Sequence, residues 1–345
     1  MRHRQSATIS HPLLDRCANR KCLEGVALDS TAHGQEWSAE GAAERAGCFG
    51  LIGDELVKRL EPFAGGGRRL QRVLVPGSGL GRLPYDISRL GYHCQGNEFS
   101  YFMLLGSNFI LNRCAPEPLT LQPWAHHLSN SHSLADQLRV LSVPDVAPAD
   151  APPPGYFSHG RNCQYVATPS TLVGVPMGQM RGRQQIDSTA PLLGDFSMCA
   201  GDFVEVYSAQ PGEWDSIVTC FFIDTAPNVF DYIRTIHTAL RPGGVWINFG
   251  PLLYHFEEMY AEMSVELPLD ELMAVIASFG FEIVQRQENL PCCYTSNCRS
   301  HAPRIQLEHL CTGVPHQLLM FSVRHRSLMQ TRYNCTFFTA VKTED

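Results

Sequence analysis

The sequence lacks the features that mark membrane, secreted and nucleic-acid-binding proteins. No apolar run approaches the roughly 20 residues that cross a bilayer, and the polar start 1–6 leads into no apolar segment of the kind that a secretory signal contains. The net charge is −7, and no basic stripe suited to a phosphate backbone is present. We therefore expect no membrane partner, no nucleic-acid partner, and a location in the cytoplasm or also in the nucleus.

The 13 cysteines lack the spacing of a metal site or of a disulfide framework. The one tight pair, Cys292 and Cys293, is adjacent instead of separated by two residues. Together with Cys298 and His301 it forms the nearest approach to a zinc site, but this spacing matches no common ligand pattern. We expect reduced thiols and no bound metal.

The composition is that of a protein with a substantial core. Of 345 residues, 44% are hydrophobic and 18% are charged, which excludes global disorder and allows one large domain. Residues 1–35 are polar and irregular, so we expect them to be poorly ordered. Residues 36–345 are expected to form the folded domain.

A glycine-rich turn follows the first predicted strand. The apolar run 72–76 leads into Gly77, Gly79 and Gly81, and a helix is expected from 83 to 90. The spacing is G-x-G-x-G and not the G-x-G-x-x-G of dinucleotide-binding folds. It favours a methyl-donor fold, while a nicotinamide oxidoreductase stays open as a rival class.

Glu98 ends the next predicted strand, 21 residues after Gly77. In nucleotide-binding α/β folds an acid at this distance holds ribose hydroxyls. The glycine turn and Glu98 together predict a nucleoside site at one edge of the sheet.

The remaining periodicity predicts a doubly wound, mostly parallel, seven-stranded α/β sheet with an N-terminal helical segment. The run 215–224 is apolar almost throughout, as in a strand covered on both faces. Ser38 is expected to cap the first helix, and the aromatic residues of helix 100–111 are expected in the core. The expected helices are 42–60, 83–90, 100–111, 229–240 and 269–279; the expected strands are 72–76, 92–98, a short passage from 196, 215–224, 245–249, 281–284 and 336–341.

Asp224 is expected at the carboxyl end of a central strand, where such sheets bind ligands. A carboxylate there could accept a hydrogen bond from an aromatic N–H. The alternative is that Asp224 caps the following helix. His255 and Tyr333 have similar alternatives, as a core histidine and an edge tyrosine.

Several strings resemble the carnosine N-methyltransferase family over about 36–150, 195–290 and 328–342. The most specific are Val75–Leu83 and Gly250–Phe256; the others include Trp37-Ser38, Gln95–Ser100, Gly201–Phe203 and Thr219–Ala226. The resemblance implies a class I methyltransferase, Rossmann-like fold that uses S-adenosyl-L-methionine and methylates an imidazole nitrogen of carnosine, giving anserine. Some relatives methylate histidines in proteins, so a histidine-containing peptide is an alternative substrate.

The resemblance also implies site residues. It assigns Gly77, Glu98, Asp202, Phe203 and Cys220 to the donor, with Gly79 in the same turn. Glu98 would bind the ribose, and Asp202 with Phe203 the adenine. The substrate would meet the catalytic residues Asp224, His255 and Tyr333. Both a monomer and a homodimer stay open.

The chain departs from the family at two places. A glutamine and an arginine that help close over the donor are replaced by Ala32 and Gln35. Two stretches, 156–194 and 299–326, have no counterpart in the family. Both lack periodicity, and our hypothesis is that they are untranslated sequence read through in the gene; if they are part of the protein, they are insertions that form surface loops. These departures leave a third class open, a catalytically impaired methyltransferase-like binding protein.

Overall fold

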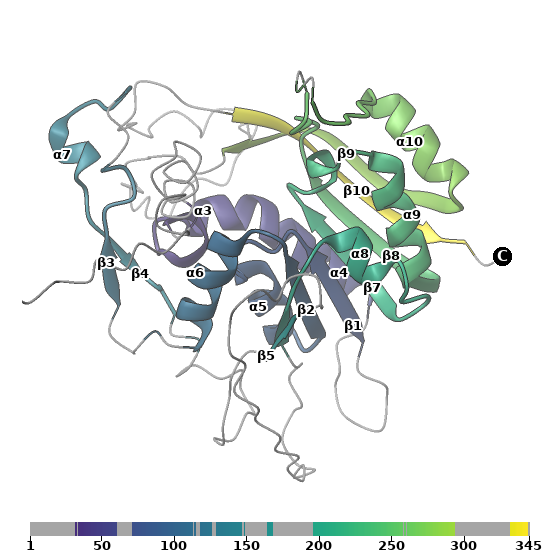
Figure 1. Ribbon diagram of the computed structural model, residues 1–345, viewed down its shortest axis with the longest axis horizontal. Coiled ribbons are helices and arrows are strands. Elements are labelled where there is room, and N and C mark those ends of the chain that lie inside the picture. The colour runs from purple at the N-terminus through teal and green to yellow at the C-terminus, as the bar shows by residue number, and fades with distance from the viewer. Residues whose placement is uncertain are drawn as a thin grey trace, which may run out of the picture.

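The computed structural model describes a single eight-stranded sheet, a small hairpin and the helices around them (Figure 1). Of the predicted N-terminal segment 1–35, residues 1–31 and 33 lie outside the described part, as do the segment 299–326, most of 156–194, and the residues Cys298 and His301. In the described part, no helix has the length and apolarity needed to cross a bilayer. The described residues are 32, 34–60, 71–112, 114, 118–125, 129–146, 148, 164–167, 196–257, 259, 261–293 and 332–343.

The sheet has the order β5-β6-β2-β1-β7-β8-β10-β9. All neighbours are parallel except those of β10, which runs antiparallel to both β8 and β9. The seven predicted strands and their final antiparallel hairpin are therefore confirmed. The strands are β1 Arg72–Pro76, β2 His93–Glu98, β5 Gln164–Ala167, β6 Phe196–Ala200, β7 Trp214–Cys220, β8 Leu240–Gly250, β9 Phe281–Cys293 and β10 Arg332–Lys342.

The eighth strand, β5, lies at the edge of the sheet beside β6. It belongs to the stretch 156–194, in which the sequence shows no sustained period. Four residues are too few to establish an alternation, which is why the sequence does not predict this strand.

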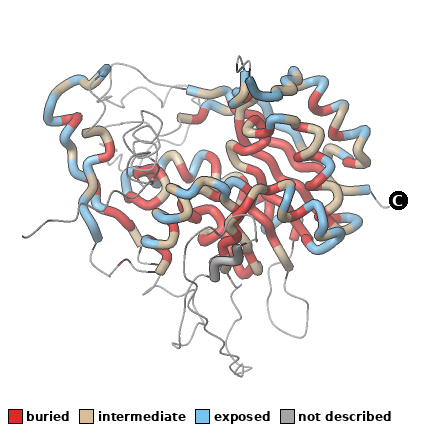
Figure 2. The backbone as a smooth tube through the Cα atoms, in the orientation of Figure 1, coloured by how far each residue is buried: buried red, intermediate tan, exposed pale blue. Residues whose placement is uncertain are grey.

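Helices cover both faces of the sheet. On one face α8 Phe203–Tyr207, α9 Val229–Ala239 and α10 Leu269–Ser278 pack in one hydrophobic cluster. On the other face a second cluster contains α4 Leu51–Arg59 and α5 Arg82–Arg89. The strands alternate between the clusters, as Val73 and Leu74 show in β1. Figure 2 shows the buried residues concentrated along these strands.

The first helix is interrupted. It consists of α3 Ala42–Arg45, a π-helical turn η1 Ala46–Gly50, and α4. The prediction that Ser38 caps it is wrong, because Gly41 occupies the cap position. The Ser38 hydroxyl instead accepts from the Gly41 N–H and donates to the Gly34 carbonyl, which fixes the turn before the helix.

Helix α6, Tyr101–Asn112, follows Glu98 and differs from the expectation in its orientation. Its buried residues are Ser107, Ile110 and Leu111, whereas Leu105 and Phe109 are exposed. The prediction of aromatic core residues is therefore wrong for Phe109, and Phe102 is only half-buried. A helix that is apolar nearly all round carries no signal for which side faces inward.

A small hairpin lies at the end of the molecule opposite β9 and β10 (Figure 1). Its strands are β3 Leu119–Leu121 and β4 Leu141–Val143, with the short helix α7 Leu134–Gln137 between them. Just after β4, the Asp145 N–H donates to the Trp37 carbonyl at 2.7 Å. The hairpin thereby brings Asp145 beside the N-terminal segment.

Candidate active site

Of the predicted site residues, His255 follows β8 and Tyr333 lies near the start of the antiparallel β10, and the others lie at the carboxyl ends of β1, β2, β6 and β7. These strands are parallel, so their ends meet at one edge of the sheet. Strand β1 lies between β2 and β7, at the point where the strand order reverses. This is the crevice where open α/β sheets bind ligands.

The glycine turn and Glu98 are in direct contact. Glu98 is the last residue of β2, and its carboxylate accepts hydrogen bonds from the N–H groups of Gly79 at 2.8 Å, Phe99 at 2.9 Å and Ser100 at 2.7 Å. Burial raises the pKa of Glu98, and these three bonds oppose the rise. A carboxylate has about four acceptor positions, so one is left for a ligand hydroxyl.

Two features of the turn require glycine: the backbone conformation at positions 77 and 79, and the lack of space at position 77. Gly77 and Gly79 have φ of +64° and +55°, values that favour glycine. A Cβ on Gly77 would lie 2.4 Å from Cδ2 of Phe222, which itself stacks on Tyr232 with ring centroids 4.7 Å apart. Position 77 therefore has no room for a side chain.

We expect Gly77→Ala to lower the free energy of unfolding by about 2 kcal/mol or more, because the left-handed conformation alone costs roughly 1–2 kcal/mol for an L-residue and the clash with Phe222 adds to it. Urea unfolding measures this. Gly47→Ala is the control, since nothing lies within 4 Å of its added Cβ; that change should be neutral or slightly stabilising. Equal stability of Gly77→Ala and the wild type would contradict the conclusion that position 77 has no room for a side chain.

Asp202 and Phe203 lie beside Glu98 at the start of α8. Asp202 is the N-cap, and its Oδ1 accepts from the Glu205 N–H at 3.0 Å. The Gly201 N–H donates to the Glu98 carbonyl at 3.0 Å, which joins this turn to the end of β2. The Phe203 ring is buried among three aromatic rings, those of Tyr207, Phe222 and Tyr232. It thus helps to form the wall beside Asp202.

Strand β7 ends at Cys220, four residues before the predicted end at Asp224. The reason is Phe221, a bulky residue with φ of +51°, which breaks the extended backbone. Cys220 is half-buried and lies beside Cys48. Strained residues of this kind concentrate at functional sites.

Asp224 lies in a short 3-10 turn, Ile223–Thr225, and is buried. Its Oδ2 accepts from the Leu253 N–H at 3.0 Å, and its carbonyl accepts from the His255 N–H at 3.0 Å. Burial raises the pKa of Asp224, whereas the Leu253 hydrogen bond and the charge of His255 lower it. Asp224 does not cap α9, because the cap of that helix is Asn228.

His255 and Tyr333 both lie near Asp224. His255 is exposed, so it is not a core histidine. Burial and the negative charge of Asp224 raise the pKa of Tyr333. The Tyr333 ring contacts Phe221, with centroids 5.9 Å apart. The structure therefore gathers Asp224, His255 and Tyr333 beside the strained turn.

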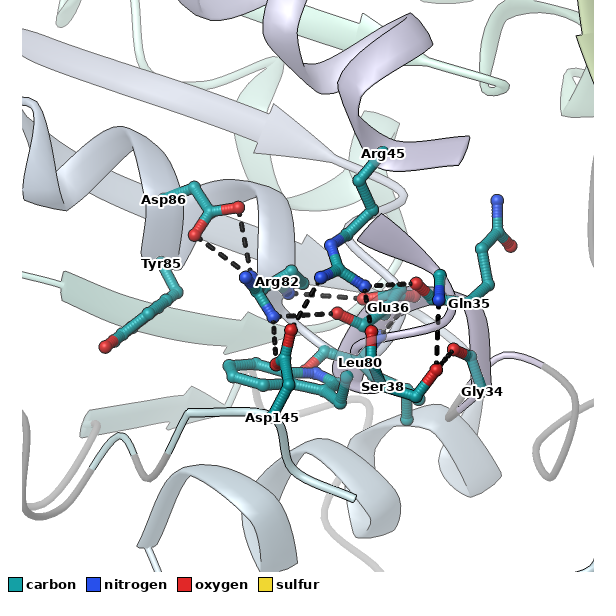
Figure 3. Close-up of polar contacts among 12 residues, drawn as sticks. Gly34, Gln35, Glu36, Ser38, Arg45, Leu80, Arg82, Tyr85, Asp86 and Asp145 are labelled. Carbon is teal, nitrogen blue, oxygen red and sulfur yellow. Dashed lines mark hydrogen bonds and ion pairs between the residues drawn. The ribbon is translucent and has the colours of Figure 1, made fainter. Parts of the chain in front are cut away.

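The N-terminal segment is fastened over the glycine turn by a group of charged residues that we call the clasp: Glu36, Arg45, Arg82 and Asp145 (Figure 3). The two oxygens of Asp145 each accept from one guanidinium, Arg45 at 2.6 Å and Arg82 at 2.6 Å. Arg45 also donates to two carbonyls of the segment, those of Gln35 at 2.7 Å and Ser38 at 2.8 Å. These bonds fix the path of the backbone that precedes α3.

Trp37 adds an apolar fastening to the clasp. Its ring is fully buried, its N–H donates to the Leu80 carbonyl at 3.2 Å, and the Arg82 guanidinium lies 5.0 Å from the ring centroid. Ala32 and Gln35, the two departures noted above, are both buried in this segment. The clasp therefore holds residues 35–38 directly against the glycine turn.

Sequence reasoning missed the roles of Glu36, Asp145 and Phe221. Of these three, only Glu36 could have been noticed from the sequence, because it directly precedes Trp37-Ser38, one of the strings that resemble the family. Asp145 lies in a proline-containing loop, and its partners are 63 and 100 positions away.

The residues present fit an adenosyl ligand. A glycine turn allows close approach, Glu98 keeps an acceptor position, and the backbone just before Asp202 is hydrogen-bonded to the end of β2. With the sheet order and the final antiparallel hairpin, these features define a class I methyltransferase fold of the Rossmann-like type, whose cofactor is S-adenosyl-L-methionine.

The chain belongs to the carnosine N-methyltransferase family. The model of the family described as carnosine N-methyltransferase matches residues 17–161 and 180–310. The match passes over 162–179, inside the first predicted insertion. It includes 156–161, 180–194 and 299–310, so these residues do have a counterpart in the family.

Relatives from animals and yeast agree with this match. Carnosine N-methyltransferase of Rattus norvegicus is 42% identical over 264 residues, covering 76% of this chain and 56% of that protein. The protein of Schizosaccharomyces pombe is 39% identical over 73% of this chain and 60% of its own length. Carnosine N-methyltransferase unmet of Drosophila melanogaster is 38% identical over 76% of this chain and 49% of its own. The chain therefore spans about half the length of these relatives.

Proposed function

We propose that this protein is an S-adenosyl-L-methionine-dependent N-methyltransferase that methylates an imidazole nitrogen of carnosine, giving anserine. The observation that carries the proposal is the position of buried Asp224, with His255 and Tyr333, across the strand ends from Glu98. The family and the names of the relatives support the substrate. The location in the cytoplasm or nucleus stays a prediction from the sequence.

The donor supplies an electrophilic methyl group on a sulfonium. On the donor side, Glu98 would accept hydrogen bonds from the ribose, Asp202 would bind the adenine amino group, and Gly77 and Gly79 would let the backbone approach the ligand. Phe203 and Cys220 complete the wall of this half of the site. The chain's task is then to place the attacking nitrogen in line with the methyl group, about 3–3.5 Å away.

Asp224 selects which imidazole nitrogen reacts. A free imidazole has a pKa near 6.5 and is largely neutral at pH 7, so little deprotonation is needed. By accepting a hydrogen bond from one ring N–H, the Asp224 carboxylate fixes the tautomer and leaves the other nitrogen's lone pair facing the donor. It also stabilises the positive charge that grows on the ring. The Leu253 N–H holds the carboxylate in this orientation.

His255 and Tyr333 orient the rest of the substrate. The imidazole of His255 is exposed and can contact the polar groups of an entering dipeptide. The Tyr333 hydroxyl, beside Asp224, can donate a hydrogen bond to the substrate. The charge of His255 lowers the pKa of Asp224, and the charge of Asp224 raises the pKa of Tyr333, so both residues lie close to Asp224. Their function in this proposal is positioning, not proton transfer.

Mass spectrometry tests the proposal. The protein is incubated with donor carrying a deuterated methyl group, together with carnosine or with a histidine-containing peptide. We expect the label on the imidazole ring of carnosine. Label only on the peptide would replace the dipeptide by a protein substrate. Donor binding by calorimetry without any transfer would favour the binding-protein alternative.

A further inference from the structure

Glu36 is placed against the glycine turn from the side opposite Glu98. Its Oε1 accepts from the Leu80 N–H at 3.1 Å and its Oε2 from the Arg82 N–H at 3.2 Å. A Cβ on Gly79 would lie 2.6 Å from Oε1 of Glu36, while the Gly79 N–H is bound to Glu98. Two carboxylates therefore flank one glycine, and Glu98 is the one assigned to the ribose.

Among the described residues, the Glu36 carboxylate forms no ion pair and is held by two backbone N–H groups. In the described part of the chain, the two guanidinium groups nearby are engaged elsewhere: Arg82 by Asp86 and Asp145, and Arg45 by Asp145 and backbone carbonyls. Gln35 beside it is neutral. Burial raises the pKa of Glu36 to about 7 and the charge of Glu98 adds to the rise, whereas the N–H groups of Leu80 and Arg82 and the charge of the Arg82 guanidinium lower it. A cation in direct contact with the carboxylate would lower this pKa further.

Glu36 is nevertheless only half-buried, so part of it faces the space beside the turn. Its two backbone bonds use two of about four acceptor positions on a carboxylate. Strand β1 provides no acid at this place, since it ends in Val75 and Pro76. A ligand that extends from Glu98 across the glycine turn would thus meet Glu36 as the available anion.

We propose that Glu36 binds the ammonium group at the amino-acid end of the methyl donor, and so distinguishes a complete adenosyl amino acid from shorter thioadenosine compounds. The inference rests on the proposed function, because it requires the adenosyl group at Glu98. In this binding, Arg82 and Asp145 hold the N-terminal segment in place, and Glu36 supplies the negative charge that binds the ammonium group.

Calorimetry with three ligands tests the inference on the full chain. S-adenosylhomocysteine has both the ammonium and the carboxylate, its decarboxylated amine keeps only the ammonium, and 5′-methylthioadenosine has neither. Glu36→Gln should weaken the first two by about 10- to 100-fold, the range for one lost charge-assisted hydrogen bond. It should leave 5′-methylthioadenosine within about twofold, because the adenosyl contacts remain. Asp54→Asn, which removes a negative charge from an exposed position on α4, should change none of them.

The other outcomes overturn the inference in distinct ways. If Glu36→Gln weakens all three ligands equally, Glu36 only shapes the turn. If it weakens S-adenosylhomocysteine but not the amine, the ammonium is not its partner. Unchanged affinity for every ligand would remove Glu36 from the site. If the wild type binds none of the three, the proposed function itself fails, and the inference fails with it.

Discussion

Asp224→Ala is expected to lower the turnover of carnosine by about 100- to 10,000-fold, the range observed for a positioned group that handles a proton or the charge accompanying it. The reason is that the substrate imidazole loses both the acceptor that selects its tautomer and the charge that stabilises the developing imidazolium. Affinity for S-adenosylhomocysteine should survive, since the donor residues Glu98 and Asp202 belong to other strands. Steady-state kinetics and calorimetry measure the two effects separately.

Two further variants sharpen this test. Asp224→Asn keeps the shape and the bond from Leu253 but not the charge, so it separates charge stabilisation from orientation. Asp270→Ala removes an exposed acid from the first turn of α10 and should leave turnover unchanged. Near-normal turnover in Asp224→Ala would exclude Asp224 from the reaction.

Asp145→Ala is expected to lower the free energy of unfolding by about 3–5 kcal/mol, as when one partner of a buried ion pair is removed. The change leaves two buried guanidinium groups, those of Arg45 and Arg82, without the carboxylate that both contact. The exposed fractions of these two side chains are only 7% and 10%, so water compensates little. Urea unfolding provides the measurement.

The matched control is Glu288→Ala. Glu288 pairs with Arg286 at 2.7 Å, but the two side chains are 44% and 35% exposed, so the loss should stay within about 1 kcal/mol. Similar small losses in both variants would show that the clasp is not a buried ion-pair network. Donor affinity should also fall in Asp145→Ala, because the segment that carries Glu36 is then less firmly held.

The features predicted from the sequence are those that depend on local patterns. The glycine turn, Glu98 at the end of β2, and the helix α9 each arise from a few neighbouring residues with a strong preference. The apolar run of β7 was also recognised, but its end was not, because the left-handed conformation of Phe221 comes from tertiary contacts and not from its residue type.

The features that the sequence did not predict depend on distant partners. Asp145 meets Arg45 and Arg82 only because the β3–β4 hairpin carries it back to the N-terminal segment. The exposed face of α6 could not be assigned for a different reason: nearly every residue of that helix is apolar, so the pattern has no polar side. Site residues at the ends of strands are thus easier to predict from the sequence than the contacts of the segments that pack over the site.

A structure of the protein with bound S-adenosylhomocysteine tests the central claim most directly. The account predicts that the ribose hydroxyls lie within hydrogen-bond distance of Glu98 and that the sulfur faces Asp224 across the end of β7. A sugar bound away from Glu98 would contradict the donor site, the mechanism and the position of the acceptor together.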